Sequence, residues 1–284
     1  MNIIVGISWP FANGELHIGH AASSLPGDVI ARYHRLKGNN VLLVSGTDCH
    51  GTPIEVKALQ ENRSPKDIVN ECHTSFSKDF KDLGISFDLY NRTDDEYHKK
   101  FVQEQFKKYY ANNYLYEKEE EQLYCDNCKM FLADRYIIGI CPKCGAEIKG
   151  DECENCGSLL TIDEVKETKC AICGSKATKR KNKNLYFELS RFQDEIRNLV
   201  NTKKDNWREN AVKFTERYLS EGIPDRCAPR VQNYGVQIPI EGYEDKKLYG
   251  WFENVWGYVT ASKKYAEKNN LDWEEFWKNK VNLS

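Results

Sequence analysis

The chain has 284 residues, of which 30% are charged and 40% hydrophobic, and its formal net charge is −2. This profile is typical of a soluble globular protein with room for one or two domains, and it excludes a global positive field that would attract nucleic acid or membranes. The first residues lack the basic region and apolar core of a signal peptide, and no apolar run approaches the ~20 residues of a membrane span. We therefore expect no membrane partner.

Strand and helix patterns alternate at the start of the chain. Residues 3–7 form an apolar run typical of a buried strand, and a turn rich in Pro, Asn and Gly follows at residues 10–14. A helix is predicted over residues 18–37, with Gly38 as a left-handed stop. Its apolar face consists of Ala21, Leu25, Val29, Ile30, Tyr33 and Leu36. Residues 41–45 predict a second strand.

Two further helices carry recognisable start signals. Ser64 precedes Pro65, which predicts a capped helix that ends near residues 83–84. Thr93 and Glu96 have the spacing of a capping box, which predicts a helix to about residue 112. This order of strands and helices favours a parallel α/β sheet.

The composition changes at the acidic run of residues 117–121. From there to residue 184 the chain is rich in Cys, Gly and Lys and has little periodic apolar pattern, so we expect metal to hold this stretch together. Beyond it, residues 189–200, 207–220 and 258–268 have helical patterns, and residues 248–252 have the pattern of a strand. The α/β halves therefore flank a long insertion.

Eight of the eleven cysteines form four Cys-x-x-Cys pairs within that insertion. The pairs are Cys125/Cys128, Cys141/Cys144, Cys153/Cys156 and Cys170/Cys173. Eight thiols at this spacing suit two structural zinc sites with four sulfur ligands each, and they favour a reduced, cytoplasmic protein over a disulfide scaffold. The spacing allows a sequential pairing of the doublets and a nested one, and it does not choose between them. Cys49, Cys72 and Cys227 remain outside the metal sites.

A second motif lies between the first strand and the first helix. His17 and His20 are three residues apart in the first turn of the predicted helix, so both rings lie on one face. The helix start adds N–H groups and a positive dipole end, and Gly14 and Gly19 allow close approach of an anion to the backbone. Together these features predict a triphosphate site in which imidazole N–H groups bind phosphate oxygens.

Residues 10–20, Pro-Phe-Ala-Asn-Gly-Glu-Leu-His-Ile-Gly-His, resemble the first hallmark motif of class I aminoacyl-tRNA synthetases. Residues 28–38 and 45–54 resemble the methionyl branch of that class. The resemblance, looser through the cysteine region, reaches the segment around Trp251. It implies a Rossmann-like parallel sheet, incomplete here, that is interrupted by a connective insertion with zinc knuckles.

The resemblance also implies an activity and its site. The activity is methionine–tRNA ligation: ATP with Mg²⁺ converts methionine to its adenylate, and the methionyl group is transferred to initiator and elongator methionine tRNA. The residues implied for ATP binding are Asn13, Gly14, His17, Gly19 and His20, with His17 and His20 as catalytic groups. Those implied for amino-acid binding are Trp9, Phe11, Asp48, Trp251 and Tyr258, where Asp48 holds the ammonium group and the aromatic rings suit a thioether.

The implied domains are residues 1–115 and 248–284 for the catalytic fold and residues 116–247 for the insertion, with knuckles over about 123–176. The family's knuckled domain has the nested pairing, which joins Cys125/Cys128 to Cys170/Cys173 and Cys141/Cys144 to Cys153/Cys156. The implied fragment is an N-terminal half without the anticodon-binding domain, because the second ATP motif of the family, Lys-Met-Ser-Lys-Ser, does not occur in the sequence. We therefore expect the isolated chain to be weakly active or inactive.

Two segments depart from the family pattern. Residues 253–258, Glu-Asn-Val-Trp-Gly-Tyr, replace the usual Asp-Ala-Pro-Ile-Gly-Tyr, so Val255 and Trp256 bear on the pocket for the amino acid. Val231 lies where family members usually have the acidic residue of Thr-Arg-Asp.

Two other interpretations stay open at this point. One is a free-standing truncated paralogue that binds ATP, an amino acid or a partner without charging tRNA. The other is a zinc-dependent RNA-binding module, with a basic run beside the knuckles as its RNA contact. That run consists of Lys176, Lys179, Arg180, Lys181 and Lys183. The two histidines and Asp48 have no role in such a module, which favours the enzyme.

Overall fold

The computed structural model describes residues 1–132, 136–150, 153–158, 160, 162–230, 232–244, 246–277 and 282–283. The chain divides into two compact units, Met1–Phe106 with Gln232–Ser284, and Lys107–Val231. The domain boundaries expected at 115/116 and 247/248 remain predictions, and Val231 lies outside the described residues. No helix among the described residues is both long and apolar enough to cross a bilayer.

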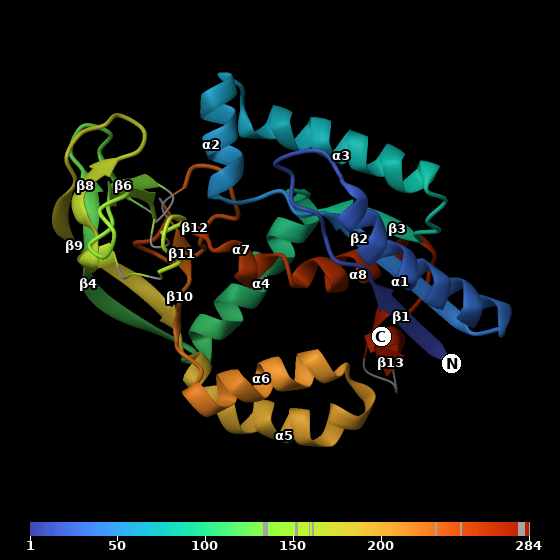
Figure 1. Ribbon diagram of the computed structural model, residues 1–284. Coiled ribbons are helices and arrows are strands. Elements are labelled where there is room, and N and C mark those ends of the chain that lie inside the picture. Colours follow the sequence, from blue (N-terminus) through green and yellow to red (C-terminus); the bar gives the residue numbers. More distant parts are fainter. Residues whose placement is uncertain are drawn as a thin grey trace. The chain divides into compact units, whose positions relative to one another are not determined.

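The first unit contains the parallel sheet that the sequence predicts (Figure 1). Its strand order is β13-β1-β2-β3, and each neighbouring pair is parallel. The strands are β1 (Asn2–Gly6), β2 (Asn40–Thr47), β3 (Leu89–Arg92) and β13 (Asn282–Leu283). A parallel sheet needs crossover connections, and α1 (Ile18–Leu36) and α3 (Pro65–Asp82) provide them between successive strands.

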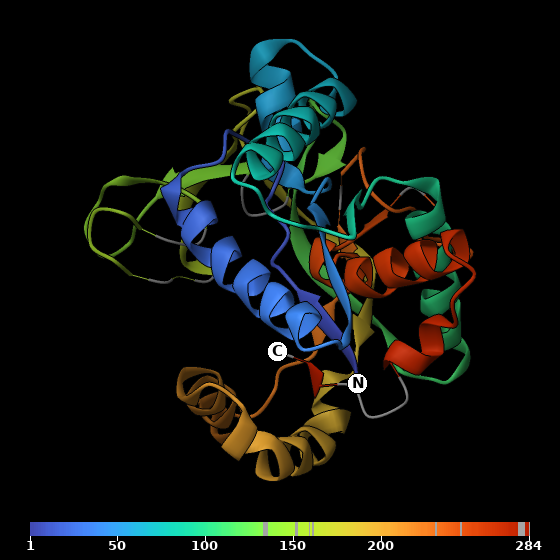
Figure 2. The same ribbon diagram turned by 90° about the vertical axis from the view of Figure 1, so that its right-hand side faces the viewer.

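Helices cover both faces of this sheet (Figure 2). Side chains alternate along a strand, so Ile3 packs into the cluster that includes residues of α1 and α3, whereas Ile4 packs with Ala261 of α8 (Trp256–Lys268) on the other face. Burial on both faces explains why β1 and β2 appear in the sequence as continuous apolar runs and not as alternating ones. The other elements of this unit are α2 (Thr52–Glu61), α7 (Gly250–Glu253), α9 (Trp273–Trp277), β12 (Lys247–Leu248) and the start of α4 (Glu96–Ala111).

Two local predictions in this unit are wrong. The capping box of Thr93 and Glu96 does not form: Asp95 precedes the helix and accepts from the N–H of Tyr97, while the Thr93 hydroxyl accepts from the N–H of Cys49. The strand expected over residues 248–252 ends at Leu248, and α7 begins at Gly250. Both errors arise from short signals that tertiary contacts override. The cap predicted for α3 is confirmed, since the Ser64 hydroxyl accepts from Asp67 N–H.

The apolar face predicted for α1 is largely exposed. Val29 and Leu36 expose 63% and 89% of their surface, whereas Ser24, Asp28 and Ala31 are buried. The prediction failed because a polar contact sets the buried face: the carboxylate of Asp28 accepts from both the N–H and the hydroxyl of Ser86, at 2.8 and 2.6 Å.

The second unit is built from two antiparallel sheets and two helices (Figure 1). The larger sheet contains β10 (Arg226–Cys227), β9 (Thr178–Phe187), β4 (Leu115–Cys125) and β5 (Met130–Phe131), in that order. The smaller one contains β7 (Glu147–Lys149), β6 (Ile137–Ile140) and β8 (Lys166–Cys170). The helical elements are η2 (Ile162–Glu164), η3 (Leu189–Phe192), α5 (Gln193–Lys203), η4 (Lys204–Asn206) and α6 (Glu209–Glu221), with β11 (Pro229–Arg230) at the end.

Charge complementarity pairs the two longest strands, β4 and β9. The acidic run of β4 lies opposite the basic run of β9, and Lys181 and Lys183 form ion pairs of 2.8 and 2.7 Å with Glu119 and Glu117. Opposite charges across an antiparallel pair stabilise the register. Of the basic run that we considered for RNA contact, Lys181 and Lys183 are thus paired within their own sheet, and Lys179 and Arg180 pair with Asp163 and Asp126.

Candidate active site and metal centres

His17 and His20 form a reciprocal cap at the start of α1. The His17 ring accepts through Nδ1 from the N–H of Gly19, and the His20 ring accepts through Nδ1 from the N–H of His17, both at 3.1 Å. The ring centroids are 4.0 Å apart. This confirms that the two rings lie on one face of the helix start, and it satisfies N–H groups that a helix otherwise leaves without partners.

The cap also fixes the tautomer of each neutral ring. Because Nδ1 accepts in both rings, the proton of each neutral imidazole is on Nε2. His17 is exposed and His20 partly buried, so these N–H groups are accessible to a ligand. Burial, together with the neighbouring His17, lowers the pKa of His20, which favours the neutral donor at pH 7.

Glycine at position 19 is required by the position of the His17 ring. A Cβ atom on Gly19 would lie 2.9 Å from Cε1 of that ring and would displace it. The turn before the helix is held from outside: Lys57 donates to the carbonyl of Asn13 at 3.2 Å, and Cys72 donates to the carbonyl of Gly14 at 3.8 Å.

Asp48 is the first residue beyond β2, and backbone hydrogen bonds connect it to the same turn. Ala12 donates to the carbonyl of Asp48, and Asp48 donates to that of Pro10, both at 2.9 Å. Its Oδ2 accepts from the amide of Asn254 at 3.1 Å, whereas its buried Oδ1 has no partner. Burial, with the nearby charge of Glu253, raises the pKa of Asp48 to about 7.

The structure brings Trp9 and Tyr258 close to Asp48. Their ring centroids are 6.0 Å apart, and Cβ atoms on Gly46 and Gly257 would lie 2.3 and 2.8 Å from the indole, so only glycines leave room for it. The charge of Asp48 contributes, after burial, to the raised pKa of Tyr258.

The other two aromatic residues of the predicted site differ in position. Phe11 forms a backbone bridge with Asp48, and its ring lies against Gly51, where a Cβ atom would be 3.1 Å away. Trp251 lies in the short helix α7 and exposes 66% of its surface. Their roles in amino-acid binding remain predictions. Val255 is half exposed, and Trp256 packs edge-to-face on Phe101 at 5.5 Å.

A fully buried charge cluster, which we did not predict, lies behind this site. The carboxylate of Glu253 contacts Nδ1 of His50 at 2.8 Å and Nε2 of His98 at 3.0 Å, and none of the three side chains is more than 1% exposed. Thr260 contacts the remaining nitrogen of His98 at 2.9 Å. Although burial raises the pKa of Glu253, the two histidines lower it below its ordinary value. No pattern in the sequence shows that Glu253 meets His98 and His50, which lie 155 and 203 positions away from it in the chain.

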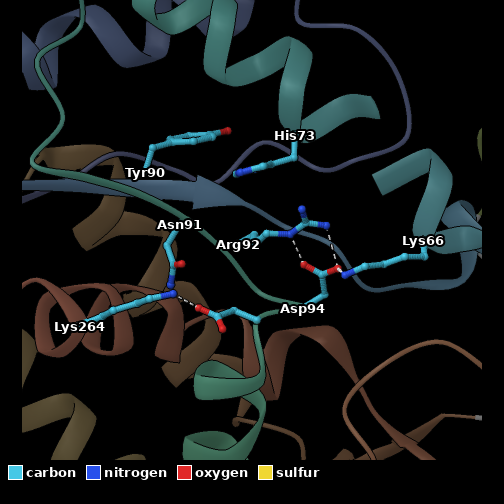
Figure 3. A pocket seen from close by; sticks show the side chains of 8 residues that line it. Lys66, His73, Tyr90, Asn91, Arg92, Asp94 and Lys264 are labelled. Atoms are coloured by element: carbon cyan, nitrogen blue, oxygen red, sulfur yellow. Dashed lines mark hydrogen bonds and ion pairs between the residues drawn. The ribbon is translucent and has the colours of Figure 1, made fainter. Parts of the chain in front are cut away.

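A cavity of about 240 Å³ at the carboxyl end of β3 contains a second charged group (Figure 3). Asp94 accepts from Lys66 at 2.5 Å and from Arg92, and Lys264 pairs with Asp95. The lining residues are Lys66, His73, Tyr90, Asn91, Arg92, Asp94, Asp95 and Lys264. Burial, with the charge of Arg92, lowers the pKa of His73 to about 4, so that ring is neutral. The charged side chains named here pair with one another and stabilise the carboxyl end of β3.

The eight paired cysteines gather into two groups in the nested arrangement. One group is Cys125, Cys128, Cys170 and Cys173, and the other is Cys141, Cys144, Cys153 and Cys156. Within each group the sulfur atoms lie within 4.8 Å of one another, and the closest pairs are 3.4 to 3.9 Å apart. Four sulfurs around zinc at about 2.3 Å lie about 3.8 Å apart, so both groups suit a tetrahedral metal. None of the eleven cysteines, all described, forms a disulfide.

Each cysteine pair is followed by a residue in the left-handed region. Gly145, Gly157 and Gly174 have φ of 75°, 68° and 71°, and Lys129 has 54° after the first pair. In the three glycine turns, the glycine N–H donates to the carbonyl of the first cysteine, at 3.0, 2.7 and 2.8 Å. This repeated turn points both thiols of a pair to one side, and its Cys-x-x-Cys-Gly signal was present in the sequence.

Comparison with known proteins agrees with this geometry. Residues 3–284 match the family described as "tRNA synthetases class I (M)". The chain is 50% identical over 277 residues to methionine–tRNA ligase 1 of Alkaliphilus oremlandii and 48% identical over 279 residues to methionine–tRNA ligase 1 of Bacillus cereus. The aligned region covers 98% of this chain and 51% of each relative, so the chain spans about half of the relatives' length.

A solved structure shares the fold. It is the Mycobacterium tuberculosis methionyl-tRNA synthetase in complex with methionyl-adenylate, with a TM-score of 0.72, 20% sequence identity, and coverage of 100% of this chain and 51% of that one. The family match extends over nearly every residue, and the histidine cap, the Asp48 site and the nested cysteines lie within it. The chain therefore belongs to the methionyl-tRNA synthetase family of class I.

Proposed function

We propose that this chain supplies the amino-acid and ATP subsites of a methionine–tRNA ligase. The observation that carries the proposal is that the loop leading to the histidine cap is hydrogen-bonded through Pro10 and Ala12 to the backbone of Asp48. The cap presents two Nε2–H donors, and Asp48 has a buried carboxylate oxygen without a partner. An enzyme that joins ATP to an amino acid needs a phosphate site and an ammonium site side by side. The names of the curated relatives and the adenylate in the solved neighbour support this assignment.

In the proposed reaction, the carboxylate of methionine attacks the α-phosphorus of ATP, which forms methionyl-adenylate and releases pyrophosphate. Negative charge shifts onto the phosphate oxygens during this step. His17 and His20 donate from Nε2 to those oxygens, and Gly19 leaves the space that they need. Asn13 and Gly14 shape the approach to the phosphates.

The thioether side chain lies against Trp9, Phe11, Trp251 and Tyr258 in this proposal, since sulfur binds favourably at the edges of aromatic rings. Asp48 pairs with the ammonium group, which is a charge-assisted hydrogen bond in a water-poor site. The methionyl group then passes to the 3′ end of initiator or elongator methionine tRNA. A cytoplasmic location is part of the same proposal.

We propose zinc as the metal of both cysteine groups and MgATP as a substrate. The donor set fits zinc, because thiolates at tetrahedral spacing prefer it and four ligands leave no open position for catalysis. The thiols of one group are coupled: the hydroxyl of Ser175, among other groups, lowers the pKa of Cys173 to about 5, whereas the hydrogen bond with Cys173 and burial raise that of Cys128 to about 12. The role of these ions is structural.

Methionine-dependent exchange of pyrophosphate into ATP by the intact protein tests the proposal. The sharpest variant is His17→Asn, because asparagine still caps a helix through its side-chain oxygen but lacks the Nε2–H donor. We expect at least about a hundred-fold loss of exchange with little change in thermal stability. His34→Asn, on the same helix but away from the cap, is the matched control. Full exchange in His17→Asn, or failure of the wild-type protein to bind methionine, would reject the proposal.

A further inference from the structure

Several unpartnered polar atoms are buried beside Asp48. Among the described residues, Asp48 Oδ1 and Asn254 Oδ1 are buried acceptors without a hydrogen-bond partner, and Nε1 of Trp9 and Nε2 of His50 also have none. Buried polar atoms nearly always have partners in folded proteins, so a group of unsatisfied ones marks a place for a ligand. Two of them are acceptor oxygens on residues that share a hydrogen bond, and each needs a donor.

The amide of Asn254 can point in only one way if Asp48 is ionised. A carboxylate oxygen accepts and does not donate, so the nitrogen of the amide must face it, as the 3.1 Å contact to Oδ2 shows. Oδ1 of Asn254 is then a free acceptor on the other branch of the amide. The hydrogen bond between the two side chains therefore joins two residues that each keep one buried acceptor oxygen without a partner.

Asn254 is held in place by its neighbour in the chain. Glu253 has no exposed surface and bonds His50 from the loop after β2 and His98 from α4. These contacts fix the end of α7 against the loop that follows Asp48 and against α4. Since the carboxylate of Glu253 only accepts, both histidines present N–H groups to it.

We propose that Asn254 is a second binding residue for the α-ammonium group of the amino acid, beside Asp48, and that Glu253 is the residue that positions it. The inference rests on the proposed function and adds a residue to it. An ammonium group fits the site because it carries a positive charge and three N–H donors. The free oxygen atoms of Asp48 and Asn254 each need such a donor.

The test compares methionine with 4-(methylthio)butanoate, the same molecule without the amino group, as ligands of the intact protein. Binding of both is measured by calorimetry or by inhibition of pyrophosphate exchange. In Asn254→Ala, affinity for methionine falls by roughly ten- to one-hundred-fold, the range for a hydrogen bond to a charged group. Affinity for the des-amino compound changes by less than about twofold, since it never used that acceptor.

The matched control is Asn210→Ala, an exposed asparagine on α6, which leaves both affinities unchanged. Equal losses for the two ligands in Asn254→Ala would show a purely structural role and overturn the inference, as would no loss at all. Failure of the wild-type protein to bind methionine would instead reject the proposed function itself.

Glu253→Gln gives a second readout that a structural role does not produce. The groups that face Asp48 are Glu253, His50, Asn254 and Tyr258. Removal of the Glu253 charge takes away one cause of the raised pKa of Asp48. The pH midpoint of methionine binding therefore moves to lower pH in Glu253→Gln, whereas an unchanged midpoint contradicts the positioning role. Glu96→Gln, an exposed glutamate on α4, is the control.

Discussion

The two units are stabilised in different ways. In the first, aliphatic and aromatic side chains fill both faces of a parallel sheet, with Phe76, Phe80 and Leu43 among the fully buried ones. In the second, the smaller sheet has a minor apolar cluster of which Cys141 and Cys153 are themselves members. Cysteines of the two four-sulfur groups therefore occupy positions where a larger domain would have apolar residues. A segment with few apolar residues can fold if the binding of a metal by its side chains supplies the free energy that an apolar core would otherwise give.

Removal of metal by a chelator should produce the largest difference in stability between the two units. Removal of metal, or the single change Cys170→Ser, eliminates a site whose apparent binding energy is on the order of 10 kcal/mol. We expect elemental analysis to fall from about two zinc ions per chain to about one in Cys170→Ser, and backbone amides of β6 and β8 to lose protection from hydrogen exchange. Amides of β1 and β2 stay protected. Cys227→Ser, outside both cysteine groups, is the control, and loss of protection in β1 would contradict the comparison.

A core truncation should act on the first unit without involving metal. Phe76→Ala removes a ring that is 1% exposed between α3 and the sheet, which costs about 3 to 5 kcal/mol of unfolding free energy. Denaturant titration measures the loss, and zinc content stays unchanged. Phe214→Ala, with a ring that is 58% exposed, is the matched control and costs little. A metal-dependent loss in Phe76→Ala would show that the two units do not unfold independently.

Asp48→Asn should stabilise the protein while it abolishes methionine binding. Burial, followed by the charge of Glu253, raises the pKa of Asp48 from 3.8 to about 7, so the folded state binds a proton that the unfolded state releases above about pH 4. The free energy of unfolding therefore decreases as pH rises from about 4 to 7, and Asn removes this cost.

Thermal melts at pH 8 measure the gain in Asp48→Asn, which we expect to be on the order of 2 to 4 kcal/mol, and melts at pH 4 should show almost none. In the wild type, affinity for methionine weakens below pH 7 because the ammonium group needs the ionised form. A gain that is equal at both pH values would disprove the assigned cause.

The charge ladder of β4 and β9 should give the smallest effect. Lys181 and Glu119 form a 2.8 Å pair, but both side chains are more than half exposed. A double-mutant cycle with alanine at both positions should give a coupling of about 0.2 to 1 kcal/mol that 1 M salt removes. A larger coupling energy that salt does not reduce would mean that ion pairs, in addition to the proposed metal sites, stabilise the second unit.

Much of the first unit could be predicted from the sequence. The strands β1 and β2 and the helices α1 and α3 follow from apolar runs, helical spacing and caps, because these signals are local. The failures are instructive. The Thr93 cap was wrong because its hydroxyl bonds Cys49, which is distant in sequence, and the buried face of α1 was wrong because Asp28 binds Ser86.

The candidate site shows the same division. The sequence by itself determined the pair of histidines at the helix start, the eight thiols and the family resemblance, since each is a short pattern in which spacing alone places the groups together. Only the tertiary structure decided that His50, His98 and Glu253 meet, that Asn254 faces Asp48, and that acidic β4 pairs with basic β9. The reason is physical: these contacts join residues far apart in the chain, and their partners are selected by burial and charge after the sheets have formed.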